Sequence, residues 1–181
     1  MKFLIACTLL FAAAPAFAKP AQVLLLRHGE KQELGNLLTA KGWSRAQALP
    51  KLFDRPEFHF KGDPVALYAM KPNSDDPSLR PQETLKYVAE KFKLTIDTEF
   101  NIDDYKHLVK EVMKDTRNDG KLVVICWEHK VLEDIAVEFG VDPKPKYHKD
   151  DFDRAWLLTF EGGDVKFEDY AQKLLPGDSK D

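Results

Sequence analysis

The chain of 181 residues carries 27 lysine and arginine residues against 30 aspartate and glutamate residues, which gives a formal net charge of −3 at pH 7. This balance, with no block of basic residues, argues against a nucleic-acid partner. The length and a hydrophobic fraction of 44% suit one domain with a sizeable core.

The first 18 residues, MKFLIACTLLFAAAPAFA, have the three parts of a secretory signal: a lysine near the start, an apolar run, and small residues at Ala16 and Ala18. The apolar run is shorter than the roughly 20 residues of a membrane-spanning helix, and Pro15 interrupts it. We predict a signal peptide over residues 1–18, a single domain over residues 19–181, and a periplasmic or secreted protein without membrane association after cleavage.

The two cysteines predict a domain without an internal disulfide. Cys7 leaves with the signal peptide, so Cys126 has no partner within the mature chain. Stability must therefore come from core packing. The sequence leaves the oligomeric state open.

Strand-like and helical segments alternate along the predicted mature chain. Apolar runs of strand length occupy residues 23–26, 65–68, 94–97, 122–126 and 155–160. Helical patterns cover residues 39–53 with Thr39 as the cap, then 81–92, about 104–114 and 131–139. This order predicts an α/β three-layer domain with a mostly parallel central sheet flanked by helices. The turn-rich connections at 71–78 and 142–151 are candidates for the rim of a site.

Basic and imidazole side chains follow several of these runs where the strand leaves the sheet. VLLLRHGEK places Arg27 and His28 after the first run, SLRPQETL places Arg80 before the second helix, and VVICWEHK places Glu128 and His129 after the fourth run. The carboxyl ends of neighbouring parallel strands lie side by side. We therefore expect these side chains to converge on one crevice.

Two arginines and two histidines around one point suit a phosphate group. Guanidinium groups match phosphate oxygens bidentately and stay charged, and imidazole is nucleophilic near neutral pH. The sequence has no His-x-x-x-His pair and no paired-cysteine ligand set. It therefore predicts neither a metal site nor another cofactor.

Four segments, LLLRHGEK, LTAKGWSRAQAL, SLRPQETL and CWEHK, occur in this order. The ordered set resembles the histidine phosphatase superfamily, also called phosphoglycerate-mutase-like, over nearly all of residues 23–160. FDRAWLLTF, residues 152–160, further resembles a small exported bacterial subgroup of that superfamily.

The resemblance implies a role for each matching residue. His28 would be the nucleophile that accepts the phosphoryl group. Arg27 and Arg80 would hold the phosphate oxygens. His129 would bind the phosphate and stabilise charge in the transition state, so it would be both a catalytic and a phosphate-binding residue.

The proton donor for the leaving group is open among several carboxylic acids. Glu128 is the preferred candidate because its neighbour is His129, although adjacent strand residues point to opposite faces of a sheet. The alternatives are Glu30, Glu99, Asp103 and Asp104.

These patterns favour an exported, metal-independent phosphomonoesterase, a histidine acid-phosphatase-type hydrolase that acts on a small phosphorylated substrate through a phosphohistidine. One alternative is a phosphomutase, against which export argues. The other is a phosphate- or phospholigand-binding domain without turnover. The natural substrate is not fixed by the sequence, and neither rim loop has the dense basic patch that a polyphosphorylated ligand would need.

Other conspicuous residues receive structural interpretations. Arg45 resembles the superfamily's arginine at that place and is expected to form a structural ion pair. We expect the three tryptophans, Trp43, Trp127 and Trp156, to pack in or around the core. We expect the remaining histidines on the surface: His59, His107 and His148.

Overall fold

The computed structural model describes residues 19–74 and 76–179. The predicted signal peptide lies outside the described residues. No helix within the part of the chain that the structure describes is both long enough and apolar enough to cross a membrane.

The elements alternate as the sequence predicts. The strands are β1 (Gln22–Arg27), β2 (Pro64–Ala69), β3 (Ile96–Asp97), β4 (Leu122–Trp127), β5 (Arg154–Glu161) and β6 (Asp164–Ala171). The α-helices are α1 (Ala40–Ala48), α2 (Arg80–Phe92), α3 (Tyr105–Lys114) and α4 (His129–Glu138). Short 3-10 helices cover Leu49–Asp54, Pro56–Phe58, Ile102–Asp104 and Thr116–Asn118.

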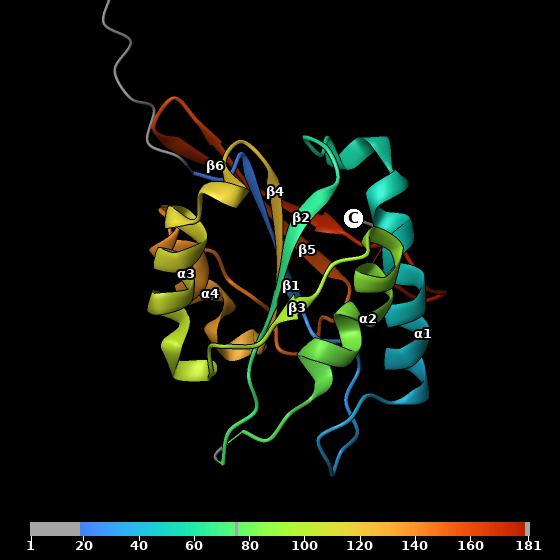
Figure 1. The fold of residues 1–181 in the computed structure, drawn as a ribbon. Coiled ribbons are helices and arrows are strands. Elements are labelled where there is room, and N and C mark those ends of the chain that lie inside the picture. The colour runs from blue at the N-terminus through green and yellow to red at the C-terminus, as the bar shows by residue number, and fades with distance from the viewer. Residues whose placement is uncertain (1–18, 75, 180–181) are drawn as a thin grey trace, which may run out of the picture.

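One sheet of six strands runs in the order β3-β2-β4-β1-β5-β6. The first four strands of this order pair in parallel, whereas β5 and β6 are antiparallel to their neighbours. Helices α3 and α4 cover one face of the sheet, and α1 and α2 cover the other (Figure 1). The predicted three-layer α/β domain with a mostly parallel sheet is confirmed.

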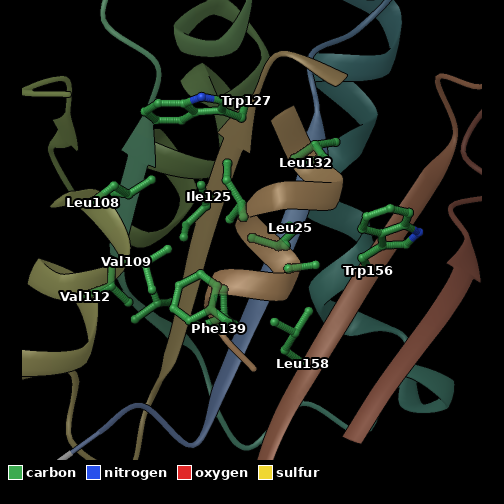
Figure 2. Packing of buried hydrophobic residues seen from close by; sticks show 14 of the residues in the cluster. Leu25, Leu108, Val109, Val112, Ile125, Trp127, Leu132, Phe139, Trp156 and Leu158 are labelled. Atoms are coloured by element: carbon green, nitrogen blue, oxygen red, sulfur yellow. The ribbon is translucent and has the colours of Figure 1, made fainter. Parts of the chain in front are cut away.

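The two central strands explain why the sequence has unbroken apolar runs. Every residue of β1 and β4 is buried, because helices cover both faces to which the alternating side chains point. Leu25, Ile125 and Trp127 pack with α3 and α4 (Figure 2), whereas Leu24 and Val124 face the other layer. Each fully buried side chain of this kind contributes about 1.5–3 kcal/mol, so packing stabilises the sheet.

Several boundaries differ from the predictions. The helix predicted over residues 39–53 ends at Ala48 and continues as a 3-10 helix, because Pro50 lacks the N–H that an α-helix requires. Helices α2 and α4 begin one and two residues earlier than predicted, and β3 covers only part of the predicted run.

Strand β6 was not predicted. Its sequence, DVKFEDYA, is rich in charged residues, and its burial is that of an edge strand with one face toward solvent. The available signal was the Gly162–Gly163 pair, whose φ angles of 59° and 105° form the turn between β5 and β6.

The structural interpretations of the tryptophans and remaining histidines are confirmed. Trp127 and Trp156 belong to the core, and Trp43 is half-buried. The three histidines expected on the surface are exposed: His59, His107 and His148. Cys126 is a buried free thiol whose pKa burial raises strongly, so it is unreactive.

Candidate active site

The pairing of β1 with β4 brings the two principal motifs together. Arg27 lies opposite Trp127 in the parallel register, and the amide of His28 donates to the Trp127 carbonyl at 3.3 Å. His28 and Glu128 are therefore the first residues beyond two adjacent strand ends. This is the edge at which parallel α/β sheets bind ligands.

His28 is held in one orientation and is completely buried. Its Nδ1 lies 2.7 Å from the Gly29 carbonyl oxygen, and its Nε2 lies 3.1 Å from Glu128 Oε2. A carbonyl oxygen can only accept, so the hydrogen-bond network assigns a proton to Nδ1. Nε2 is consequently the nitrogen that faces the rest of this buried cluster of side chains. We call the cluster the pocket; its members are Arg27, His28, Arg80, Glu128 and His129.

The Arg27 guanidinium is held by the rim segment that leads into β5. One of its terminal nitrogens donates to the carbonyl oxygens of Lys149 at 2.5 Å and Asp151 at 2.8 Å. The ring of Phe152 lies 3.7 Å from the guanidinium carbon, a cation–π contact. Burial lowers the pKa of Arg27. The predicted rim loop over residues 142–151 thus contacts one of the predicted phosphate ligands.

Arg80 reaches the same pocket from the first turn of α2. It donates to the Gly35 carbonyl at 3.3 Å, and its other terminal nitrogen lies 3.7 Å from Glu128 Oε2. Thr84, one turn later, donates its hydroxyl to the Arg80 carbonyl and accepts from the Gly29 amide at 2.9 Å. Thr84 therefore ties the helix that carries Arg80 to the loop that follows His28.

Glu128 and His129 point toward one pocket because neither is a strand residue. Glu128 is the N-cap of α4 and His129 is its first residue, so the alternation expected of strand neighbours does not apply. A carboxylate oxygen of Glu128 is in close contact with Nδ1 of His129. Burial raises the pKa of Glu128, but the contacts with His129 and His28 lower it more, so the net pKa lies well below its ordinary value.

The pocket keeps buried nitrogens that have no hydrogen-bond partner within the described chain. They are Nε of Arg27 and Nε of Arg80. A buried donor left unpaired costs about 1–3 kcal/mol. Two guanidinium charges also stand against the single carboxylate of Glu128. This combination of spare donors and net positive charge suits an anion with several oxygens.

The structure also assembles three groups that the sequence did not suggest as metal ligands. Donor atoms of His28, Glu128 and His129 all lie within 4.8 Å of one another. The guanidinium of Arg80 lies against the same carboxylate. A fixed positive charge beside the donor set opposes a cation and favours an anion.

The other candidate proton donors have different surroundings. Glu30 pairs with Arg45 and Lys41, and Asp104 accepts from the backbone amide of Asn101 at 3.4 Å. Glu99 and Asp103 are exposed. Among the described residues, no hydrogen bond or ion pair joins the four alternatives to the imidazole of His28, and Glu128 is the candidate that contacts it.

Sequence reasoning missed three residues that shape the pocket: Thr84, Phe152 and Gly42. A Cβ atom on Gly42 would lie 2.4 Å from the carbonyl oxygen of Glu30, so only glycine allows α1 to approach the loop after His28 this closely. Glycine inside a predicted helix was the available signal for Gly42. Thr84 and Phe152 carried no local signal, because their roles depend on distant partners.

Comparison with known proteins gives matches among solved structures. Protein-family profiles and curated protein sequences give no match. The protein histidine phosphatase SixA complexed with tungstate aligns over 83% of this chain and 97% of its own, with a TM-score of 0.53 and 14% identity. Phosphoserine phosphatase from Entamoeba histolytica in complex with 3-phosphoglyceric acid aligns over 85% of this chain and 99% of its own, with a TM-score of 0.52 and 15% identity. Phosphoglycerate mutase from Bacillus anthracis str. Sterne aligns over 85% of this chain and 94% of its own, with a TM-score of 0.52 and 16% identity.

The fold and the pocket define an α/β protein with a cationic, imidazole-containing site at the carboxyl edge of its parallel strands. The same fold occurs in solved structures of two phosphatases and of a phosphoglycerate mutase. The resemblance predicted from the four sequence segments is confirmed at the level of the fold.

Proposed function

We propose that this protein is a phosphomonoesterase of the histidine phosphatase superfamily that acts through a phosphohistidine at His28. The observation that carries the proposal is the placement of the buried His28 Nε2 at 3.1 Å from Glu128 Oε2, with Arg80 at 3.7 Å from the same oxygen. A nucleophile, a carboxylic group and positive charge then meet at one point, as phosphoryl transfer requires.

In the first step, the lone pair of His28 Nε2 attacks phosphorus and the ester P–O bond breaks. In the resting protein the ionised Glu128 accepts the proton of Nε2. When the phosphate dianion binds, this proton passes to the carboxylate, which leaves the lone pair on Nε2 while Nδ1 keeps its proton on Gly29. The leaving oxygen takes a proton from the Glu128 carboxyl. Arg27, Arg80 and His129 stabilise the charge on the equatorial oxygens, and the buried Nε atoms of the two arginines have no other partner in the described chain.

In the second step, the Glu128 carboxylate takes a proton from water, the water oxygen attacks phosphorus, and the P–N bond breaks. Inorganic phosphate leaves, and both His28 and Glu128 return to their starting states. The lowered pKa of Glu128 keeps the carboxylate ionised, as this step requires, although the same shift weakens it as a base. The acid role requires the bound phosphate, since a dianion beside the carboxylate raises its pKa.

The lowered pKa also supports a second candidate, a phospholigand-binding domain without turnover. A carboxylate that stays ionised cannot protonate a leaving group, whereas the cationic pocket would still bind the ligand. A phosphomutase, the third possibility, would return the phosphoryl group to a second hydroxyl instead of water.

One assay separates the three functions. The purified protein is incubated with p-nitrophenyl phosphate, with and without glycerol, then quenched in alkaline detergent, which preserves the P–N bond, and examined for phosphohistidine. Release of nitrophenol and phosphate with a trapped phosphohistidine supports the phosphomonoesterase. Binding of phosphate without nitrophenol release supports the binding domain. Transfer of phosphate mainly to glycerol supports the mutase.

We also propose that the protein is exported and acts in the periplasm or outside the cell on a small phosphorylated substrate. The charge, apolar run and small-residue end of residues 1–18 support export. N-terminal sequencing of the protein from its native cells tests this directly. A mature chain that begins at Lys19 is the expected result, and retention of Met1 would overturn it.

A further inference from the structure

The segment that follows β6 contains a buried carboxylate, that of Asp178. Asp178 accepts two hydrogen bonds from the guanidinium of Arg45, at 2.7 and 2.9 Å. The same carboxylate accepts the amides of Leu174 and Leu175 at 2.9 and 3.0 Å. Only 3% of the Asp178 side chain is exposed. These bonds fold residues 174–178 back onto the body of the protein.

Arg45 joins this tail to the loop that carries the pocket histidine. Its guanidinium also donates to both carboxylate oxygens of Glu30, at 2.8 and 3.1 Å. Glu30 lies two residues after His28. The predicted structural ion pair of Arg45 is confirmed, and it is part of a three-residue network whose third member comes from the C-terminal tail.

The next residue of the tail makes a second connection. The backbone amide and the hydroxyl of Ser179 both donate to the carboxylate of Asp153, the hydroxyl at 3.2 Å. The Asp153 carbonyl in turn accepts the amide of Gln172 at 2.6 Å. Asp153 is buried, so both its side chain and its backbone are fixed by residues that follow β6.

Asp153 ends the segment that holds the Arg27 guanidinium. The adjacent Phe152 lies under that guanidinium at 3.7 Å, and the carbonyls of Asp151 and Lys149 accept its hydrogen bonds. A movement of Asp153 would therefore shift an aromatic surface and two acceptors at once. The tail has no direct hydrogen bond to Arg27 in the described chain.

We propose that residues 174–179 are a latch that positions Arg27 for phosphate binding, with Asp178 and Ser179 as its positioning residues. The latch contacts the body of the protein at two points, Asp178 with Arg45 and Ser179 with Asp153. Asp153 in turn fixes the segment that orients the guanidinium of Arg27. A misplacement of about 1 Å in a binding group can cost up to about 100-fold in rate. The kinetic consequence rests on the proposed function, whereas the orientation of Arg27 does not.

The first test measures orientation without any activity. The Nε–H of Arg27 is buried and should give a resolved signal in a ¹H–¹⁵N spectrum, assigned by its loss in Arg27→Lys. Asp178→Asn should shift or broaden this signal and leave the Arg80 Nε–H signal in place. Glu161→Gln, which breaks the exposed Lys61–Glu161 pair at 2.9 Å, is the matched control and should change neither. An unchanged Arg27 signal in Asp178→Asn would overturn the proposal.

The second test is a pair of double-mutant cycles read by orthovanadate affinity and by kcat and KM for p-nitrophenyl phosphate. Asp178→Asn should weaken vanadate binding and raise KM about tenfold, which is about 1.4 kcal/mol, with a smaller change in kcat. In an Arg27→Ala background the same substitution should add almost nothing, because the group that it positions is gone. In an Arg80→Ala background the tenfold loss should persist.

Equal losses in the two backgrounds would show a general structural effect and contradict the latch. Should Asp178→Asn fail to fold, Ser179→Ala, which removes one hydroxyl at the surface of the network, takes its place in the same spectra and cycles. Ser179→Ala should give the same pattern at about threefold, the loss of one modest hydrogen bond. An inactive wild-type protein that binds no vanadate would refute the proposed function, while the Arg27 signal would still decide the latch.

Discussion

Two buried groups of charged residues lie close to each other in this protein, and they use their hydrogen-bonding capacity differently. In the first group, the network that joins Arg45 to Glu30 and to Asp178 of the latch, Arg45 donates through Nε and both terminal nitrogens. In the pocket, Nε of Arg27 and Nε of Arg80 are buried without a hydrogen-bond partner among residues 19–74 and 76–179. The first group is saturated, whereas the second retains donors for a ligand.

The pKa directions of the two arginines agree with this difference. Burial lowers the pKa of Arg45, but its hydrogen bonds to Asp178 and Glu30 raise it more, so its net pKa is raised. For Arg27, burial outweighs the nearby negative groups and the net pKa is lowered. Both arginine residues are 2% exposed. Burial alone therefore does not separate a structural arginine from a binding one; the count of occupied donors does.

The largest expected effect comes from removing the proposed nucleophile of the pocket. His28→Ala should reduce kcat by more than about 10³-fold and abolish the acid-labile phosphoprotein, because the imidazole proposed to accept the phosphoryl group is gone. Steady-state assays and phosphate labelling measure this. His107→Ala, at an exposed histidine, is the control. Near-normal turnover of His28→Ala would refute the phosphohistidine mechanism.

The next effect concerns the carboxylate of the pocket and should depend on the substrate. Glu128→Gln should slow alkyl phosphates by about 10²–10⁴-fold, the usual worth of general acid–base catalysis. A nitrophenyl phosphate should lose much less, because its leaving group needs little protonation. Comparison of kcat on the two substrates is the measurement. Equal losses would assign Glu128 an orienting role and move the search to Glu30, Glu99, Asp103 and Asp104.

Removal of one arginine of the pocket should weaken the binding of phosphate. Arg80→Ala should lower kcat/KM by about 10²–10³-fold, the typical cost of one transition-state donor, and should weaken vanadate binding. Arg117→Ala, which removes an exposed arginine paired with Asp115, is the matched control. If both variants bind vanadate equally well, Arg80 is not a phosphate ligand.

The network of Arg45, Glu30 and Asp178 should make the free energy of unfolding fall at acid pH. Burial raises the pKa values of Glu30 and Asp178, but hydrogen bonds from Arg45 lower them more, so both net pKa values lie below their ordinary range. Their contribution is therefore present above the unfolded values near pH 4 and is lost as the pH falls through the folded values. Urea unfolding between pH 7 and pH 3 measures it.

Asp178→Asn should accordingly reduce the free energy of unfolding at pH 7 and flatten its fall below about pH 4. The exposed-pair variant Glu161→Gln supplies the baseline for removal of one carboxylate. A variant whose acid limb runs parallel to that of the wild type would show that Asp178 does not stabilise the protein through its charge.

The last prediction is that removal of metal ions leaves the activity unchanged. Dialysis against EDTA should leave activity on p-nitrophenyl phosphate unchanged, because the guanidinium groups supply the charge that a metal would otherwise provide. Orthovanadate and tungstate should inhibit. If activity falls and only added Zn²⁺ or Mg²⁺ restores it, the cluster of His28, Glu128 and His129 holds a metal in the working protein.

The sequence predicted the elements whose surroundings are uniform. Strands β1 and β4 are buried on both faces, so their apolar runs were recognisable without any partner. Strand β6 was not predicted, because one of its faces meets solvent and charged residues mask the alternation of polar and apolar side chains. The end of α1 depended on one residue, Pro50, inside an otherwise helical pattern.

The residues of the pocket were chosen from local motifs, and their convergence required the sheet order. The sequence by itself determined which strands carry Arg27, His28, Glu128 and His129 at their ends, because hydrophobic periodicity is a local property of the chain. It preferred Glu128 among five carboxylic acids only because His129 is its neighbour, since the distances of all five to the imidazole of His28 depend on packing.

Only the tertiary structure decided the contacts between distant parts of the chain. Arg45 and Asp178 are 133 residues apart, and neither stands in a motif that predicts the other. Phe152 meets Arg27 because β5 lies beside β1 in the sheet. Periodicity records which side of an element is buried, whereas the partner of a buried charge is fixed by how the elements pack together.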